Sequence, residues 1–276
     1  MEQKTKNYGL KKEPIIIGKD YLLGGFTEVP KVELQADGQW LSFLPIAENQ
    51  SRGSVEPSSC VSMTTNNCVE ILLERLYGND HDFSDRFSAK MSGNTGEGAT
   101  PQQVAQTLKN KGVVEETEWA FSPDIDTLEK YYADIPPEIQ NKALSFLENY
   151  DFLHEYVPTD PESLKQALKL SPLGIGTPAW YQNEQGLYYR PEGMSDNHFT
   201  TLIGFLDKQY WIVFDSYENN IKHLDWNINS SVAKRFHIAK KNDTFLPEKE
   251  TNWLVDLLKA LGYAFIGLIK KIYGKK

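Results

Sequence analysis

The spacing of apolar residues predicts helices in the first half of the chain. Residues 59–77 carry apolar side chains at helical intervals, and Gly78 follows them as a helix stop. Residues 100–112 open on Thr-Pro, which suits an N-cap followed by a first helical turn, and they close on a glycine. Three further helical runs are expected, at residues 124–134, 137–150 and 160–170.

After residue 172 the pattern changes to short β-rich runs that are separated by turn residues. Earlier in the chain, residues 29–45 alternate polar and apolar positions around an Asp-Gly pair, which predicts extended chain with a hairpin. Because the helices gather in the first half and the strands in the second, the pattern indicates an α+β fold of two lobes rather than a doubly wound α/β fold. The expected strands of the second half are residues 174–179, 198–205, 210–215 and 234–240.

Composition and charge exclude several classes of protein. A hydrophobic fraction of 40% and a charged fraction of 24% are those of a globular chain, so general disorder and fibrous repeats are not expected. The formal net charge is −9, which argues against nucleic-acid binding because that affinity depends on neutralising phosphates. Two cysteines cannot form a disulfide scaffold and suit a reducing compartment. The basic start is not followed by an apolar stretch of signal-peptide length, so no secretory signal is expected.

Cys60 is the first candidate for chemistry, because it stands at the predicted start of helix 59–77. A thiol there feels the positive end of the helix dipole, which is expected to lower its pKa and raise its thiolate fraction. The preceding loop, residues 49–59, has little apolar cover, so we expect the thiol to be accessible. Cys68 lies two turns further along and is expected to be a small core residue. A buried structural thiol is the alternative interpretation of Cys60.

A cysteine nucleophile needs a base, and the base needs a group that orients it. His198 lies where a polar turn leads into an apolar strand, and Asp215 ends the next predicted strand. Adjacent antiparallel strands can bring these two side chains together, so that the carboxylate fixes the imidazole tautomer and stabilises the imidazolium. No HExxH or CxxC pattern occurs, so neither a metal nor a cofactor is expected.

Several separated segments resemble the papain-like cysteine proteases. The nucleophile helix of that family is similar to SCVSMTTNNCVEILLERLYG, its histidine strand to NHFTTLIGF, and the strand of its orienting asparagine to YWIVFDSY. The spacing between Cys60 and His198 falls inside the roughly 130–150 residues of the family signature. The resemblance covers most of residues 29–240 and implies the papain-like two-lobed fold. In that fold the helical lobe carries the cysteine, and an antiparallel β lobe carries His198 and Asp215.

The resemblance also implies an activity and the roles of four residues. The chain is expected to be a cysteine-type peptidase, a thiol protease that hydrolyses peptide bonds in a peptide or protein substrate without a cofactor. Cys60 corresponds to the nucleophile, His198 to the base, and Asp215 stands where the family has asparagine. Gln50 corresponds to the glutamine that, together with the Cys60 amide, holds the oxyanion. An ungapped match would fall on Ser54 instead, so the loop before the nucleophile must carry an insertion.

Departures from the family pattern keep other functions open. Val61 and Tyr217 replace two family tryptophans, and the glutamine is displaced. A non-catalytic papain-fold protein with a structural or assembly role is therefore one alternative. A peptidoglycan-cleaving hydrolase of the same fold is another. A transglutaminase-like acyltransferase ranks third, because its histidine usually lies far closer to its cysteine.

The ends of the chain are expected to lie outside the peptidase domain. We expect an N-terminal extension at residues 1–28, the domain at 29–245 and an amphipathic tail at 246–276. Residues 252–273 place large apolar side chains on one face of a predicted helix that ends in lysines. Its uninterrupted apolar part is too short to span a bilayer, so docking on the domain or another subunit is expected first and association with a membrane surface second, and a true span is the remaining alternative.

Overall fold

The computed structural model describes residues 7–16, 20, 22–23 and 29–243. Helices dominate the first half of this part of the chain, and strands dominate the second half. The α-helices are α1 (Cys60–Tyr77), α2 (Asp85–Met91), α3 (Pro101–Lys111), α4 (Leu128–Tyr131), α5 (Pro137–Asn149) and α6 (Pro161–Leu168), and the short 3₁₀ helices are η1 (Leu41–Phe43) and η2 (Glu116–Glu118).

A single six-stranded sheet, whose strands do not follow one another in chain order, forms the second lobe. All of its neighbouring strands pair antiparallel, in the spatial order β1-β6-β2-β3-β4-β5. The strands are β1 (Tyr150–Val157), β2 (Leu173–Thr177), β3 (His198–Leu206), β4 (Tyr210–Phe214), β5 (Ile221–Asp225) and β6 (Ala233–Lys240). The fold is therefore α+β with an antiparallel sheet, as the sequence predicts.

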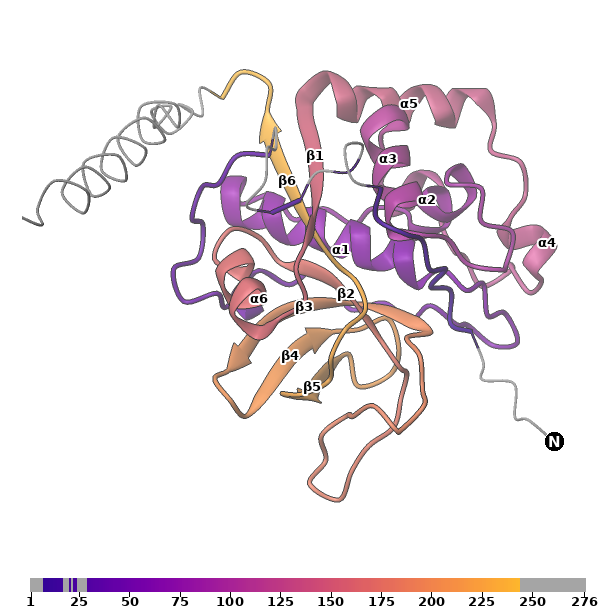
Figure 1. Cartoon of the computed structure of the whole chain (residues 1–276). Helices are drawn as coiled ribbons and strands as arrows, with labels where there is room; N and C mark the ends of the chain where they lie inside the picture. The colour runs from indigo at the N-terminus through magenta and orange to yellow at the C-terminus, as the bar shows by residue number, and fades with distance from the viewer. Residues whose placement is uncertain (1–6, 17–19, 21, 24–28, 244–276) are drawn as a thin grey trace, which may run out of the picture.

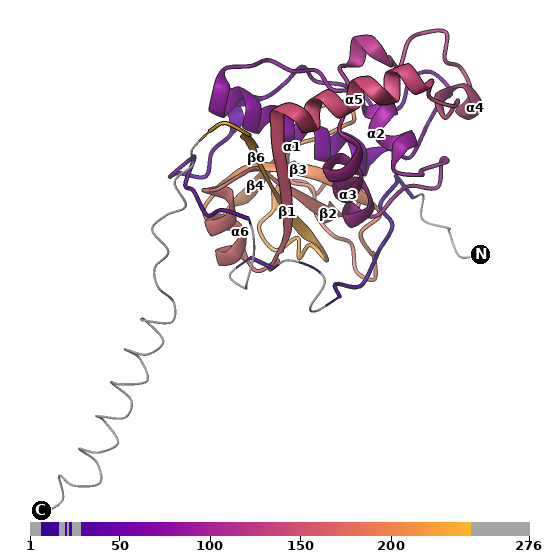
Figure 2. The same ribbon diagram turned by 90° about the horizontal axis from the view of Figure 1, so that it is seen from above.

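Helix α1 lies between the two lobes. It packs against β3, β2 and β6 on the sheet side and against α2 and α3 on the helical side (Figure 1). Helix α5 lies on the outside of the helical group and leads directly into β1 (Figure 2). Because both lobes cover α1, its residues from Cys60 to Leu73 are buried almost throughout. The first residue of α1 consequently sits at the junction of the lobes.

Local chemistry sets the helix ends where the sequence predicts them. The Thr100 side chain accepts a hydrogen bond from the backbone of Gln103, and proline occupies the first turn of α3. Gly78 ends α1 in the left-handed conformation, with φ of 62°. At Gly112, after α3, a Cβ atom would lie 1.9 Å from the carbonyl oxygen of Ala143, so only glycine fits that close approach.

The hairpin predicted for residues 29–45 is wrong, although the Asp-Gly turn forms. Backbone groups of this segment bond to other elements: Leu34 donates to the carbonyl of Lys169 at 2.8 Å, and Trp40 to that of Ile203 at 2.8 Å. The Trp40 side chain is completely buried, and its indole nitrogen donates to the carbonyl of Leu168 at 2.7 Å. Burial of this ring against α6 and β3 therefore replaces pairing within the segment.

Three elements that the sequence pattern did not reveal are α2, β1 and β5. Strand β1 pairs with β6 along its whole length and contains Glu155, which reads as a surface residue. In the structure Glu155 is opposite Arg235 and forms a buried ion pair with it. Because Arg235 lies far from Glu155 in the sequence, no local sequence pattern predicts this strand. Only α4 forms within the predicted helical run 124–134.

The amphipathic helix expected at residues 252–273 lies outside the described residues. Among the helices that the structure describes, none is both long and apolar enough to cross a membrane.

Candidate active site

The sheet brings His198 and Asp215 together. His198 is the first residue of β3 and Asp215 directly follows β4, and these two strands are antiparallel neighbours. The imidazole Nε2 donates a hydrogen bond to the Asp215 Oδ1 atom at 2.6 Å, and both side chains are fully buried. The other ring nitrogen, Nδ1, is buried and has no hydrogen-bond partner among the described residues. With the proton on Nε2, Nδ1 carries the lone pair of a base.

Helix α1 places Cys60 beside this histidine. The helix is tied to β3 by Thr64, whose hydroxyl group donates to the carbonyl of Phe199 at 2.9 Å. A backbone hydrogen bond from Phe199, the residue after His198, reaches the Cys60 thiol. The start of α1, which carries Cys60, therefore lies against the start of β3, which carries His198.

Gln50 belongs to the same cluster, despite its displaced position in the sequence. Its backbone donates to the carbonyl of Ser216 at 2.7 Å, directly after Asp215. Its side-chain Nε2 atom lies 2.9 Å from the Tyr217 hydroxyl group and 2.5 Å from Glu56 Oε1. The intervening loop closes on itself through a bridge between Arg52 and Val55, which absorbs the extra residues.

Three aromatic rings enclose the imidazole of His198. The ring of Trp180 lies 5.2 Å from it, that of Tyr217 5.4 Å and that of Tyr8 5.9 Å, measured between ring centroids. Tyr217 stands where the family tryptophan was expected, so its place beside the histidine follows the sequence. Trp180 and Tyr8 were not foreseen, because no motif links either residue to the cysteine or the histidine.

Residues 7–13, called the N-terminal segment from here on, run across this cluster (Figure 1, indigo). The Tyr8 backbone donates to the carbonyl of Asn197 at 2.9 Å, and the Tyr8 carbonyl accepts from Gln50 Nε2 at 3.0 Å. Further along, the Gly9 carbonyl accepts from the backbone of Ala99 at 2.9 Å. The segment thus bonds to the sheet lobe through Asn197 and to the helical lobe through Ala99.

Gly9 brings the segment into direct contact with the cysteine. A Cβ atom on Gly9 would lie 2.2 Å from the carbonyl oxygen of Ser58 and 3.1 Å from the Cys60 sulfur. A Cβ atom on Gly98 would lie 2.2 Å from the Gly9 carbonyl oxygen. Two glycines, one on each side, therefore allow the chain to pack on the cysteine without side chains between them.

Solved structures share this arrangement of elements, although no family model and no curated protein matches the chain. A digestive procathepsin L 3 of Tenebrio molitor larval midgut has a TM-score of 0.56 at 19% identity, over 75% of this chain and 72% of the other. The cysteine protease xylellain from Xylella fastidiosa has a TM-score of 0.61 at 16% identity, over 87% and 98% of the two chains. The chain has the papain-like fold. Bromelain protease from Ananas comosus is similar to it as well, with a TM-score of 0.55 at 18% identity, over 71% and 96%.

In this papain-like chain the solvent exposure and the pKa of the Cys60 thiol differ from those that the sequence predicts. Cys60 is completely buried rather than accessible. Burial raises the pKa of the Cys60 thiol, the charges of Asp215 and Glu56 raise it further, and the backbone hydrogen bonds from Phe199 and Val61 only partly oppose this. The expected lowering by the helix dipole is wrong for this arrangement, because the N-terminal segment removes water from the helix start.

Asp215 differs from the family asparagine in carrying a charge, and the structure compensates that charge. Burial by itself raises the pKa of the Asp215 carboxyl group, but the charges and hydrogen bonds of His198 and Lys222 outweigh burial and hold the pKa below its usual value. Lys222 Nζ lies 2.8 Å from Asp215 Oδ2. The sequence analysis missed Lys222, since it lies on β5, a strand that the pattern did not reveal.

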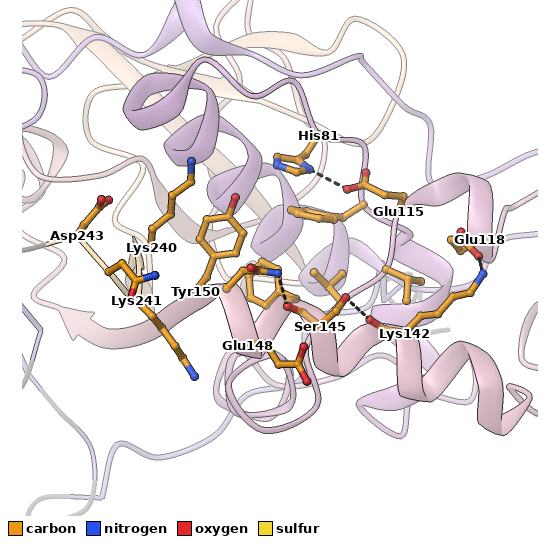
Figure 3. Close-up of a pocket in the computed structure, with 16 residues that line it drawn as sticks. His81, Glu115, Glu118, Lys142, Ser145, Glu148, Tyr150, Lys240, Lys241 and Asp243 are labelled. Carbon is orange, nitrogen blue, oxygen red and sulfur yellow. Dashed lines mark hydrogen bonds and ion pairs between the residues drawn. The ribbon is translucent and has the colours of Figure 1, made fainter.

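A cavity of about 530 Å³ lies apart from the papain-like centre, where α5 meets β1 and the end of β6 (Figure 3). His81 lines it, and its Nδ1 atom lies 2.7 Å from Glu115 while its ring stacks on Phe83. None of the residues that form the Cys60–His198 cluster lines this cavity. In the described part of the chain, no cluster of three or more His, Cys, Asp or Glu side chains could hold a metal ion.

Proposed function

We propose that this papain-like chain is a cysteine-type peptidase that hydrolyses peptide bonds through Cys60, His198 and Asp215. The observation that carries the proposal is the orientation of the imidazole. Its Nε2 atom donates to Asp215, and its unpartnered Nδ1 atom is left for the nucleophile of the neighbouring helix. A carboxylate that fixes this tautomer is what a thiol peptidase needs from its third residue.

The proposed reaction uses Cys60, His198 and Gln50 in successive steps. His198 Nδ1 takes the thiol proton as the Cys60 sulfur attacks the carbonyl carbon of the substrate. The Gln50 side-chain amide and the Cys60 backbone amide stabilise the resulting oxyanion. His198 then gives its proton to the departing amine, which leaves a thioester on Cys60. A water molecule, deprotonated by the same imidazole, hydrolyses the thioester and restores the free thiol.

The contact between Tyr8 and Gln50 supports the assignment of Gln50. A backbone carbonyl oxygen accepts a hydrogen bond from the Gln50 amide at 3.0 Å, next to the glycine that packs on the Cys60 sulfur. A substrate carbonyl placed there would receive the same donor. We also propose that the N-terminal segment must leave this position before a substrate binds, because both cannot occupy it.

A non-catalytic papain-fold protein is the second candidate, and the burial of Cys60 is the observation that favours it. A thiol that water does not reach, with a pKa raised by burial, does not react in this arrangement. The two candidates differ in what happens when the N-terminal segment is removed. A peptidase gains a reactive thiol and cleaves peptides, whereas a structural protein gains neither.

The deciding experiment compares the full chain with a chain that lacks residues 1–13. Both are treated with a peptidyl epoxide inhibitor and assayed on a mixed peptide library, with Cys60→Ala and Cys68→Ala as paired controls. The proposal expects labelling and cleavage in the shortened chain, loss of both in Cys60→Ala and retention of both in Cys68→Ala. A folded shortened chain that neither reacts nor cleaves would support the non-catalytic candidate.

A further inference from the structure

The carboxylate of Asp215 has a second partner besides the imidazole. Its Oδ1 atom accepts the hydrogen bond from His198 Nε2, and its Oδ2 atom lies 2.8 Å from the ammonium nitrogen of Lys222. The Lys222 side chain is 3% exposed and that of Asp215 is fully buried. The negative and the positive charge therefore face each other out of reach of water.

The hairpin between β4 and β5 holds Lys222 in this place. Val213 on β4 pairs with Lys222 on β5, and the backbone of Asp215 donates to the carbonyl of Asn220 at 2.7 Å. The ammonium group also donates to three backbone carbonyls of the hairpin, those of Tyr217 at 3.3 Å, Glu218 at 2.9 Å and Asn219 at 3.0 Å. Together with Asp215, these acceptors satisfy all three hydrogens of a buried lysine.

Trp180 closes the side of the pair that faces the histidine. Lys222 Nζ lies 5.2 Å from the centre of the indole ring, and the same indole lies 5.2 Å from the imidazole of His198. Among the described residues, His198 and Lys222 are the two side chains that bond to the Asp215 carboxylate. The other titratable groups that face this centre are Cys60 on α1, Tyr8 on the N-terminal segment, and Glu56 and Tyr217 on loops.

Burial makes the charge of Asp215 consequential. A carboxylate without water is strongly destabilised unless a cation compensates it. If the imidazole were the one compensating cation, the carboxylate would bias His198 toward its protonated form. Such a bias would leave less of the neutral imidazole, which is the form that takes the thiol proton. Lys222 supplies a positive charge to the other oxygen of the carboxylate, which leaves the Asp215–Lys222 pair neutral toward the imidazole.

We propose, on the basis of the function proposed above, that Lys222 is a positioning residue of the catalytic centre. Its ammonium group holds the Asp215 carboxylate against His198 and cancels its charge, so that the two residues together act as one neutral hydrogen-bond acceptor. An asparagine provides such an acceptor with a single side chain. The exchange of asparagine for aspartate in this chain is therefore matched by a buried lysine from the next strand.

The test measures the protonation of the His198 imidazole by NMR over a pH titration of the full chain. In Lys222→Met, His198 is expected to keep its proton to a higher pH than in the unchanged chain, because the Asp215 carboxylate is then uncompensated. In Asp215→Asn it is expected to lose the proton at a lower pH, because the lysine charge is then uncompensated. The double variant is expected to titrate near the unchanged chain. Lys90→Met, which removes a lysine on α2 that bonds to Tyr132 and Asp134, is the matched control and is expected to change nothing.

Three results would overturn the proposal. One is a folded Lys222→Met chain in which His198 titrates as before, and another is a double variant that does not return toward the unchanged chain. The third concerns folding: if Lys222→Met unfolds the protein, Asp215→Asn with Lys222→Met is expected to restore the fold. A double variant that also fails to fold would mean that the lysine serves the hairpin carbonyls alone.

The titration needs no catalytic activity, so the two proposals can fail separately. If the chain without residues 1–13 is folded and inert, the peptidase function is contradicted, whatever His198 does. If that chain is active and Lys222→Met leaves the titration unchanged, only the role of Lys222 is contradicted.

Discussion

The carbonyl oxygen of Tyr8 accepts a hydrogen bond from the side-chain amide of Gln50, with 3.0 Å between oxygen and nitrogen. Gln50 is the residue to which we assign the stabilisation of a substrate oxyanion, and Tyr8 belongs to the chain itself. The neighbouring Gly9 packs on the Cys60 sulfur. Through its backbone the N-terminal segment thus contacts both the proposed oxyanion donor, Gln50, and the proposed nucleophile, Cys60.

Removal of residues 1–13 is expected to expose the thiol of Cys60. The rate of Cys60 alkylation by iodoacetamide is expected to rise by roughly tenfold or more, because the residue that packs on its sulfur is gone. Peptide mapping separates the two cysteines, and circular dichroism checks the fold. Cys68, which is buried in α1, is the internal control and is expected to stay unreactive. Equal acceleration at Cys68 would indicate unfolding rather than opening.

Glu13 is expected to anchor the N-terminal segment to α3 and to β1. Its Oε1 atom accepts hydrogen bonds from the backbone of Gln102 at 2.8 Å and from the Tyr156 hydroxyl group at 2.9 Å. Both bonds involve a carboxylate, and the first lies at the start of α3, where the helix dipole favours negative charge. Glu13→Gln is expected to destabilise the closed arrangement by about 1–2 kcal/mol and so to accelerate Cys60 alkylation.

The matched control for Glu13→Gln is Glu33→Gln. Glu33 is an exposed carboxylate whose contact with Lys169 is 4.0 Å long. It makes no contact with the N-terminal segment that the structure describes, so its replacement is expected to leave the alkylation rate unchanged. A Glu13→Gln chain that reacts as slowly as the control would remove Glu13 from the anchoring of the segment.

The Asp215–Lys222 pair is expected to show strong thermodynamic coupling. Lys222→Met or Asp215→Asn alone is expected to lower the free energy of unfolding by about 3–5 kcal/mol, because each leaves a buried charge without its partner. The double variant is expected to lose less than the worse of the two single variants. Urea unfolding measures all of them, and Lys90→Met combined with Asp215→Asn serves as the additive control. Additive losses at 215 and 222 would contradict the coupling.

Glu116 is expected to make stability fall as the pH rises toward neutral. Burial raises the pKa of the Glu116 carboxyl group to about 7 from its ordinary value of 4.5, the nearby charges of Glu48 and Asp82 add to this, and a hydrogen bond from Phe121 opposes it. Between these two pH values the folded chain binds more protons than the unfolded chain, so the free energy of unfolding decreases as the pH rises.

The measurement for Glu116 is urea unfolding at pH 5 and pH 8. Because the side chain is partly exposed, the change is expected to be about 1–2 kcal/mol rather than the full value of the shift. Glu116→Gln keeps an acceptor for the Phe121 backbone and is expected to remove this part of the pH dependence. Glu129→Gln, on an exposed turn of α4, is the control, and this variant is expected to keep the pH dependence of the unchanged chain. An unchanged pH dependence in Glu116→Gln would place its origin elsewhere.

The elements that sequence reasoning found are those with local signals. The Thr-Pro start and glycine end of α3, the glycine after α1 and the Asp160 cap of α6 are all satisfied by neighbours within a few residues. Strands β3 and β4 are apolar runs with turns at their ends. The sequence could therefore order the histidine and aspartate strands correctly, and antiparallel pairing of neighbours then brings the two side chains together.

Other features depend on residues that are distant in sequence. Strand β1 buries Glu155 because Arg235 lies opposite, and Trp40 holds its segment on α6 and β3 rather than in a hairpin. In the sequence Lys222 resembles an ordinary surface lysine, and only the pairing of β4 with β5 places its ammonium group against Asp215. In each case a polar or aromatic side chain is buried, and burial is favourable only because another element supplies the hydrogen-bond or ion-pair partner of that side chain.

The sequence by itself determined which residues are candidates for the proposed chemistry, their order and their spacing, because residue type and local pattern identify a candidate nucleophile, base and acceptor. Only the tertiary structure decided how far these residues are exposed to solvent, which hydrogen bonds they form and how their charges are compensated. In the folded chain Cys60 is buried beneath Gly9, and the Gln50 amide donates a hydrogen bond to the carbonyl of Tyr8. Lys222 compensates the negative charge of Asp215. Solvent exposure and charge compensation belong to the packed arrangement, because they depend on which atoms replace water around a group.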